Sequence, residues 1–189
     1  MEDARDGFPV FIDAVKKLQP KVFMFENVRG LLYTNKWYFE LVLTELRKLG
    51  CIIDYKLLNA VNFGVPQNRE RLFVFGHRAK FKFPRPDQHK VTVGEAIGDI
   101  MFTTPPERKF FTALMDTNVE KYEKASSCIT PRDLYADRPA RTLTCRNLAS
   151  AMQRVRLQDG RRRRLVHKEA ARLQSFPDGY ELIGNETQR

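Results

Sequence analysis

Two stretches decide the fold: Val22-Phe23-Met24-Phe25-Glu26-Asn27-Val28 and Asn62-Phe63-Gly64-Val65-Pro66-Gln67-Asn68-Arg69-Glu70-Arg71-Leu72-Phe73-Val74-Phe75. In the first, four apolar residues lead to Glu26, as in a buried strand that delivers an acid at its C-terminal tip in an open α/β sheet. The second is a loop carrying Gln67, Arg69 and Arg71 that leads into another apolar strand. One acid and two guanidinium groups can hold a planar polar heterocycle by its edge.

Amphipathic helices flank these stretches. Apolar residues at helical spacing predict one helix before Pro20 and another that ends near Gly50, a residue suited to a C-terminal cap. Residues 51–60 indicate a second strand and 72–76 a third. The order helix, strand, helix, strand, loop, strand is half of a doubly wound α/β sheet. Because the strand at 22–25 is apolar on both faces, we expect a buried parallel strand.

The composition changes after residue 78, where Lys, Arg, Phe and Pro become frequent. We take residues 1–78 as the sheet domain and 79–164 as a separate region, followed by a last segment at 165–189. Within 79–164, helices are expected near 91–100 and 110–124, and residues 127–165 are expected to be irregular. A short helix is expected at 168–175.

The chain of 189 residues has a formal net charge of 33 − 23 = +10, which favours a polyanionic partner such as nucleic acid. No apolar run approaches the roughly 18 residues of a membrane span, so we expect no membrane partner. The N-terminus is acidic and unlike a signal peptide. Three scattered cysteines do not form a disulfide framework or a metal site. An intracellular protein without a bound metal is expected.

The residues quoted above resemble the DNA cytosine-5 methyltransferases. The resemblance continues, in family order, through Arg138-Pro139-Ala140-Arg141-Thr142-Leu143-Thr144 and through the run from Leu165 to Tyr180. It implies part of the Rossmann-like α/β sheet of an S-adenosylmethionine-dependent methyltransferase, with a small irregular target-recognition lobe. By this resemblance, residues 79–164 would be the target-recognition and DNA-binding region, and 165–189 would return to the sheet domain. It also implies methylation of carbon 5 of cytosine in double-stranded DNA, and it associates the chain with restriction–modification systems.

The resemblance assigns roles to three residues as catalytic candidates. Glu26 would bind the exocyclic amino group of a cytosine flipped out of the duplex and support protonation of the neighbouring ring nitrogen. Arg71 would reach the cytosine carbonyl oxygen, and Arg69 would order the site. Without the resemblance, a lone Glu after a strand is more often a solvated loop residue, and Arg-Glu-Arg more often a surface salt-bridge ladder. A spacing of two would place both arginines on one face of a strand.

Candidate DNA-binding residues lie in the second block. Arg141, Thr142, Thr144 and Arg146 are expected to contact phosphates, which position a protein without specifying sequence. The run from Arg161 to Arg164 has two interpretations. Such runs are usually solvated surfaces, but a run between two family blocks also suits salt-dependent phosphate binding.

Several parts of the family pattern are missing. The reaction needs a cysteine thiolate that attacks carbon 6, which the family carries in Pro-Cys-Gln. Cys51, expected in the core, Cys128 and Cys145 all lack those neighbours. The Gly-rich turn that holds S-adenosylmethionine and the final Gly-Asn-x-Val block are absent, so no residue of the chain is assigned to the cofactor. We expect the isolated chain to be inactive and its first strand to be an exposed edge that needs a second chain.

Alternatives from other classes remain. The chain would be a non-catalytic DNA-binding remnant if Glu26 and Arg71 served no chemistry, and an RNA-modifying relative is a third interpretation. Localisation follows from the DNA partner, as nucleoid-associated cytoplasm in a prokaryote or the nucleus in a eukaryote.

Overall fold

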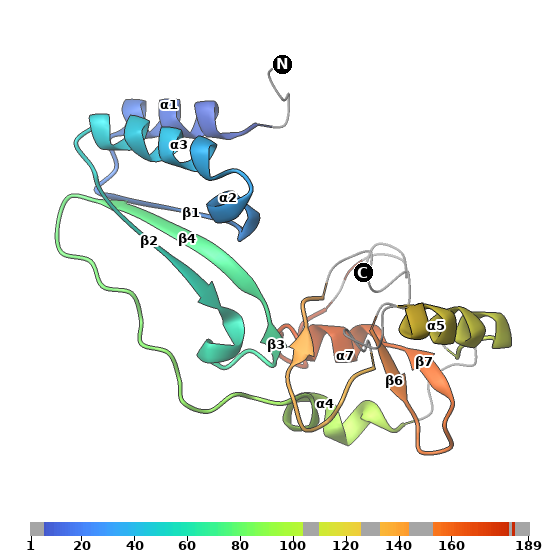
Figure 1. Ribbon diagram of the computed structural model, residues 1–189. Coiled ribbons are helices and arrows are strands. Elements are labelled where there is room, and N and C mark those ends of the chain that lie inside the picture. The colour runs from blue at the N-terminus through green and yellow to red at the C-terminus, as the bar shows by residue number, and fades with distance from the viewer. Residues whose placement is uncertain (1–5, 104–109, 126–132, 144–152, 182, 184–189) are drawn as a thin grey trace. The chain divides into compact units, whose positions relative to one another are not determined.

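The computed structural model describes residues 6–103, 110–125, 133–143, 153–181 and 183 (Figure 1). The chain forms two compact units. The first contains residues up to Asn59 together with Glu70–Pro86, and the second contains Ala60–Arg69 together with the residues from Asp87 onward. The domain boundaries expected at residues 78 and 164 stay a prediction. The two compact units differ from them, because the loop 60–69 and the described residues after 164 group with the second unit, whereas residues 79–86 group with the first.

The first unit alternates helices and strands. In chain order its elements are α1 (Phe8–Leu18), β1 (Val22–Val28), α2 (Gly30–Tyr33), α3 (Lys36–Lys48), β2 (Ile52–Asn59) and β4 (Glu70–His77). This confirms the order predicted from the sequence. Gly50 follows α3 with a φ of +77°, a conformation that suits glycine, and its N–H bonds the carbonyl of Arg47 at 2.9 Å.

The sheet of this unit has the strand order β1-β4-β2. Both outer strands run antiparallel to β4, so β1 and β2 are parallel to each other and the helices between them form a crossover. The prediction that the strand at 22–25 is buried and parallel to its neighbour was wrong, because within the described residues β1 pairs with β4 alone, in antiparallel register. Its place at the edge of this sheet agrees with the exposed edge expected from the missing parts of the family pattern. The strand is also longer than predicted and includes Glu26 in its interior.

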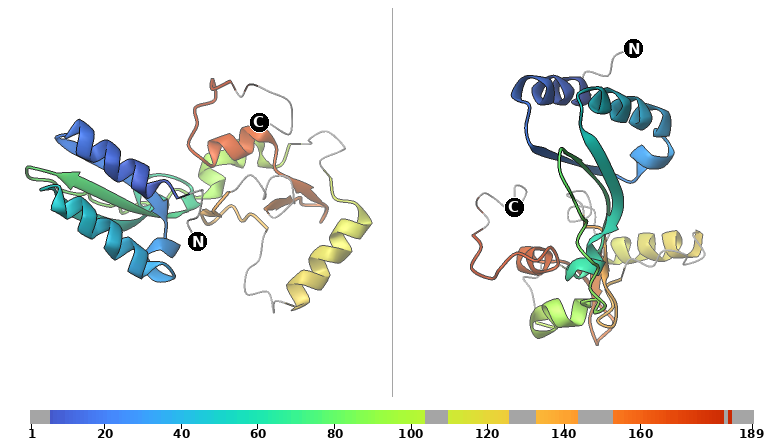
Figure 2. Two further views of the ribbon diagram at one scale, coloured as in Figure 1. Left: turned by 90° about the horizontal axis from the view of Figure 1, so that it is seen from above. Right: turned by 90° about the vertical axis from the view of Figure 1, so that its left-hand side faces the viewer.

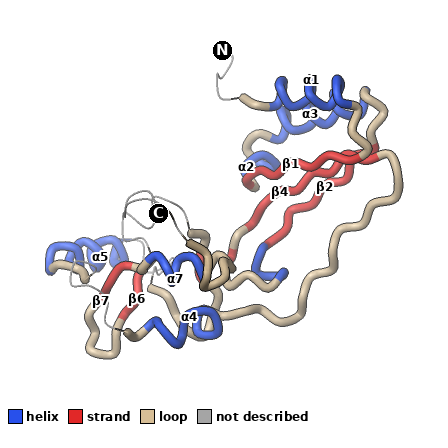
Figure 3. Tube along the Cα trace, turned by 180° about the vertical axis from the view of Figure 1, so that it is seen from behind, coloured by secondary structure: helices blue, strands red, loops and turns tan. Residues whose placement is uncertain are grey.

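Helices cover one face of this sheet. Figures 1 and 3 show α1, α2 and α3 on the same side of the strands, and Figure 2 shows α1 and α3 side by side. Their apolar stripes pack on alternate residues of the strands, including Phe23, Leu72 and Val74. Burying such a side chain stabilises a fold by about 1.5–3 kcal/mol. The aromatic ring of Phe23 lies directly over its cross-strand neighbour Gly76, where a Cβ atom would stand 1.9 Å from the ring.

The opposite face of the sheet is largely open. Strand alternation places Val22, Met24 and Val28 of β1 on this face, and Ile52 of β2 accompanies them. These four side chains are between 51% and 57% exposed. We refer to this surface as the open sheet face.

The second unit is built from short elements: η1 (Ala60–Phe63), β3 (Gln67–Asn68), α4 (Val93–Met101), α5 (Ala113–Ala125), β5 (Ala140–Arg141), β6 (Arg154–Arg156), β7 (Arg162–Arg164) and α7 (His167–Arg172). Its core is an apolar cluster from α4, α7 and the strands between them. A capping box at Thr92 and Glu95 begins α4, with both backbone N–H groups bonded to the opposite side chain.

The three helices expected in this part of the chain are confirmed as α4, α5 and α7. The region expected to be irregular contains the short strands β5, β6 and β7, with β6 and β7 paired antiparallel. Among the described residues, no helix is long and apolar enough to cross a membrane.

Candidate active site

Glu26 lies within β1, opposite Phe73 of β4. It therefore occupies the interior of a strand, and the expectation that it follows the strand at its tip was wrong. Its side chain points to the open sheet face, because alternation groups it with Met24 and Val28. The side chain is 43% exposed, so a ligand approaching that face can reach the carboxylate.

Arg71 forms an ion pair with Glu26. The Arg71 Nε lies 2.8 Å from the Glu26 Oε1, and the Arg71 Nη1 donates to the carbonyl of Glu70 at 2.8 Å. The arginine side chain is only 19% exposed, so its position is well fixed. Glu26 Oε2 and Arg71 Nη2 make no hydrogen bond or ion pair with another described residue. One carboxylate oxygen and one guanidinium nitrogen are thus left for a ligand on the same face.

Glu70 has a separate partner. Its carboxylate pairs with Arg29 at 2.8 Å, and this hydrogen bond and the nearby negative charge raise the pKa of Arg29. Because Glu70 is engaged there, it does not compete with Glu26 for Arg71.

Arg69 lies elsewhere. It falls between β3 and β4 and belongs to the second unit, where its Nη1 donates to the carbonyl of Leu143 at 3.3 Å. The expectation that Arg69 and Arg71 share one face of a single strand was therefore wrong. The sequence spacing was misleading because β4 begins only at Glu70, after the loop has left β3.

Gln67 anchors this loop. Its side chain is fully buried, its Oε1 accepts from the backbone N–H of Leu143 at 3.1 Å, and its Nε2 donates to the carbonyl of Leu173 at 3.3 Å. One amide therefore satisfies two backbone groups that are far apart in the sequence. The sequence placed Gln67 in this loop, but it gave no indication of these partners.

The predicted DNA-binding residues are only partly described. Arg141 lies in β5, which pairs parallel with β3, and the hydroxyl of Thr142 donates to the carbonyl of Asn68 at 2.7 Å. Gln153 donates to the carbonyls of Arg141 and Thr142 at 2.8 and 3.1 Å. Thr144 and Arg146 lie outside the described residues, so the set of four predicted phosphate contacts stays a prediction.

The arginine run is largely engaged within the fold. Arg163 is buried and its guanidinium bonds both oxygens of the buried Glu169, at 2.6 and 2.9 Å, and the carbonyl of Met101. Glu169 also accepts from the N–H of Val166 at 2.9 Å, at the start of α7. This ion pair connects β7 to α7, and Met101 adds the end of α4.

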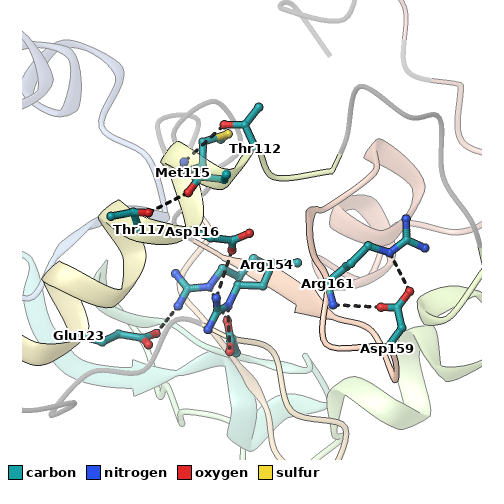
Figure 4. Close-up of polar contacts among 11 residues, drawn as sticks. Thr112, Met115, Asp116, Thr117, Glu123, Arg154, Asp159 and Arg161 are labelled. Atoms are coloured by element: carbon teal, nitrogen blue, oxygen red, sulfur yellow. Dashed lines mark hydrogen bonds and ion pairs between the residues drawn. The ribbon is translucent and has the colours of Figure 1, made fainter.

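Further arginines of this unit follow the same pattern (Figure 4). Arg154 is buried and its guanidinium contacts Glu123 of α5 and Asp133. The sequence reasoning missed these structural arginines, because a buried and a solvated arginine look alike in a charge run. The partner carboxylates are distant in the sequence and gave no local signal.

Arg172 of α7 is held by two acids. It lies 2.5 Å from Asp99 and 2.6 Å from Asp178. The hydrogen bond from Arg172, helped by the charges of Arg172 and Lys168, lowers the pKa of Asp178 to about 2. Both acids in turn raise the pKa of Arg172. These charges offset one another, which favours a structural role.

Cys51 is buried in the core beneath the helices, as the sequence predicted. Cys128 and Cys145 lie outside the described residues. Within the part of the chain that the structure describes, no group of three His, Cys, Asp or Glu residues could hold a metal ion.

Proteins of known families resemble this chain in sequence. The sequence profile of a family described as C-5 cytosine-specific DNA methylase matches residues 1–189. The type II methyltransferase M.AplI of Arthrospira platensis is 51% identical over 97% of this chain and 55% of its own length. M.MthTI of Methanothermobacter thermautotrophicus is 30% identical over 94% of this chain and 65% of its own length. The chain thus spans about half to two thirds of these relatives.

Solved structures show the same fold. A DNMT2 mutant of Spodoptera frugiperda aligns with a TM-score of 0.70 at 15% identity, over 99% of this chain and 66% of its own. The Entamoeba histolytica methyltransferase EhMeth aligns with a TM-score of 0.69, also at 15% identity, over 98% of this chain and 62% of its own. The chain therefore shares its fold with these proteins.

Proposed function

The chain belongs to the C-5 cytosine-specific DNA methylases, and on this basis we propose that it forms the base-binding part of an enzyme that methylates carbon 5 of cytosine in duplex DNA. The observation that carries the proposal is the pair of Glu26 and Arg71, fixed side by side on one exposed sheet face. Each retains one polar atom without a partner among the described residues.

The edge of cytosine complements these two atoms. Its exocyclic amino group is a donor, its carbonyl oxygen is an acceptor, and the ring nitrogen between them accepts a proton. Glu26 Oε2 would take the amino group, and Arg71 Nη2 would donate to the carbonyl oxygen. A base can offer this edge only after it leaves the helical stack.

Glu26 would also act in the chemical step. Attack of a thiolate on carbon 6 pushes an electron pair into the cytosine ring, towards the ring nitrogen. A protonated Glu26 donates its proton there, so the ring accepts the electrons as a neutral species, and the conjugate carboxylate remains paired with Arg71. We assign no nucleophile, since Cys51 is buried in the core and the other two cysteines are not described.

S-adenosylmethionine would supply the methyl group. The described residues do not fit a site for it, because none of the three sheet strands leads into a turn with closely spaced glycines. The strand β1 is followed by Arg29 and α2, β2 by η1, and β4 by Arg78 and Ala79. We therefore assign no residue to the cofactor and derive no step through it.

We also propose that the open sheet face and the free edge of β1 receive further protein, either in the same chain or in a second chain. More than half of the surface of Val22, Met24, Val28 and Ile52 is exposed, which is unfavourable for isolated apolar side chains on one face. An uncovered apolar edge strand also favours aggregation. Covering this face would bring new groups close to Glu26.

The experiment is complementation. The chain is co-expressed with the part of M.AplI that it does not match, and transfer of a labelled methyl group from S-adenosylmethionine to duplex DNA is measured. We expect activity in the complemented sample and none in the chain alone. Replacement of Glu26 by Gln should slow single-turnover transfer by about 10²–10⁴-fold, the usual contribution of a general acid.

Glu40→Gln is the matched control, since Glu40 is an exposed glutamate on α3. It should leave the rate unchanged. Equal rates for the Glu26→Gln and wild-type complexes would contradict the catalytic assignment. If no complex transferred methyl groups and Glu26→Gln left DNA affinity unchanged, the non-catalytic DNA-binding remnant would become the better account.

A further inference from the structure

The segment that follows β4 is anchored on the open sheet face by aromatic rings. Phe81 stacks on Phe75 of β4 with ring centroids 4.3 Å apart, and Phe83 meets the ring of Phe75 edge-on at 5.5 Å. The rings of Phe81 and Phe83 also contact each other at 5.0 Å. Such aromatic pairs contribute about 0.5–1.5 kcal/mol beyond the area they bury. The segment is therefore held in place although it is neither helix nor strand.

Cations alternate with these anchors. Lys80 and Lys82 are exposed, whereas Phe81 and Phe83 are partly buried, an alternation typical of extended chain, and Arg85 beyond them is also exposed. No hydrogen bond or ion pair joins any of the three cations to another described residue. Residues 78–86 contain four cations and no acid. We call Lys80, Lys82 and Arg85 the basic strip.

The basic strip differs from the arginine run of the second unit. There, Arg161 pairs with Asp159 at 2.7 Å (Figure 4). The guanidinium of Arg161 also lies over the ring of Phe110, and Arg162 pairs with Asp116 at 3.1 Å. Those positive charges are offset by carboxylates, and charges that are already paired contribute little to binding a polyanion. The strip keeps its charge available.

We propose that the basic strip binds the phosphate backbone of duplex DNA. Alternate residues of an extended chain lie about 6.8 Å apart, and each strand of a duplex presents one phosphate per about 3.4 Å of axis, so Lys80 and Lys82 reach different phosphates. The aromatic anchors reduce the ordering cost of binding, because the cations are displayed before DNA arrives. The strip positions the duplex without reading its sequence.

The test measures DNA affinity of the full chain by fluorescence anisotropy over a range of salt concentrations. Lys80→Ala/Lys82→Ala should reduce the slope of log K against log salt by about 1.8, which is about 0.9 for each lost phosphate contact. The loss should be equal on two duplexes of unrelated sequence. Lys16→Ala/Lys36→Ala, which removes two exposed lysines from α1 and α3, should leave the slope unchanged.

Phe81→Ala/Phe83→Ala separates anchoring from charge. It should weaken binding and leave the slope as in the wild type, because the cations remain but must be ordered on binding. Unchanged affinity in this variant would overturn the anchoring role. An unchanged slope for Lys80→Ala/Lys82→Ala, an equal loss in the Lys16→Ala/Lys36→Ala control, or no DNA binding by the wild type would overturn the proposal.

Binding to anionic phosphatidylglycerol vesicles in place of DNA would also overturn it. The inference rests on the proposed function for the choice of DNA as the polyanion. The proposed function and the basic-strip proposal can fail separately. Glu26→Gln tests methyl transfer and removes no proposed phosphate contact, so this variant should keep the wild-type slope of log K against log salt.

Discussion

Replacement of Arg163 by Met should destabilise the chain strongly, although the residue stands in a run of four arginines. Its guanidinium is 1% exposed and makes two charge-assisted hydrogen bonds to a carboxylate that is 0% exposed. Removing the arginine leaves the buried Glu169 carboxylate with the backbone N–H of Val166 as its remaining donor among the described residues. An uncompensated buried charge of this kind costs about 3–5 kcal/mol.

The measurement is urea denaturation followed by circular dichroism, with amide hydrogen exchange in β7 and α7 as a local readout. Arg161→Met is the matched control. It removes the same group two positions away, where the side chain is 58% exposed and pairs with Asp159 on the same turn. Its effect should be within about 0.5 kcal/mol of zero.

A double-mutant cycle completes the test. Glu169→Gln alone leaves Arg163 without a counter-charge, whereas Arg163→Met/Glu169→Gln buries no unpaired charge. The double variant should therefore be more stable than the sum of the single effects predicts, by about 2 kcal/mol or more. If Arg163→Met and Arg161→Met unfold at the same urea concentration, the structural role of Arg163 is refuted.

Three further outcomes are expected. Gly76→Ala places a Cβ atom 1.9 Å from the aromatic ring of its cross-strand neighbour and should cost about 1–3 kcal/mol of unfolding free energy, whereas Gly98→Ala in α4 has open space and should be neutral or stabilising in the same denaturation assay. Gln67→Leu leaves a buried backbone N–H and a backbone carbonyl without their partner, at about 1–3 kcal/mol for each group, measured by denaturant midpoint. Arg172 lowers the pKa of Asp178 in the folded chain to about 2, so the contribution of Asp178 to stability is present above its ordinary pKa and is lost as the pH falls towards about 2. Asp178→Asn should remove this part of the acid dependence of the denaturation midpoint. An unaltered pH profile in this variant would contradict the prediction.

The local elements of the first unit were predictable because each carries its own signal. Apolar residues at helical spacing defined α1 and α3, and Gly50 supplied the left-handed conformation that ends the second of these helices. The pairing of the strands was not predictable in the same way. A short apolar run fits a buried parallel strand and an uncovered edge strand equally well, since the difference depends on which segments arrive beside it. For β1 the neighbour is β4, which enters antiparallel between β1 and β2.

The candidate site was also only partly predictable from the sequence. The resemblance identified Glu26 and Arg71, and the ion pair at 2.8 Å places them together on one face. The environment of Arg69 could not be inferred, because two residues of spacing imply a shared face only inside one continuous strand. Gln67 is similar: an amide in a polar loop gives no sign of burial until its two distant backbone partners are known.

Distant residues also determine which positive charges of this chain remain available for binding. The sequence presents the arginine run as the densest basic feature, yet the charges of Arg161, Arg162 and Arg163 are offset by acids from the turn before β7, from α5 and from α7. The cations after β4 are fewer and less conspicuous, but Phe81 and Phe83 hold them in place and no described acid pairs with them. Available charge depends on distant carboxylates, so local density of arginine is a poor guide to a DNA-binding surface. The salt slopes of variants in the basic strip measure this available charge directly.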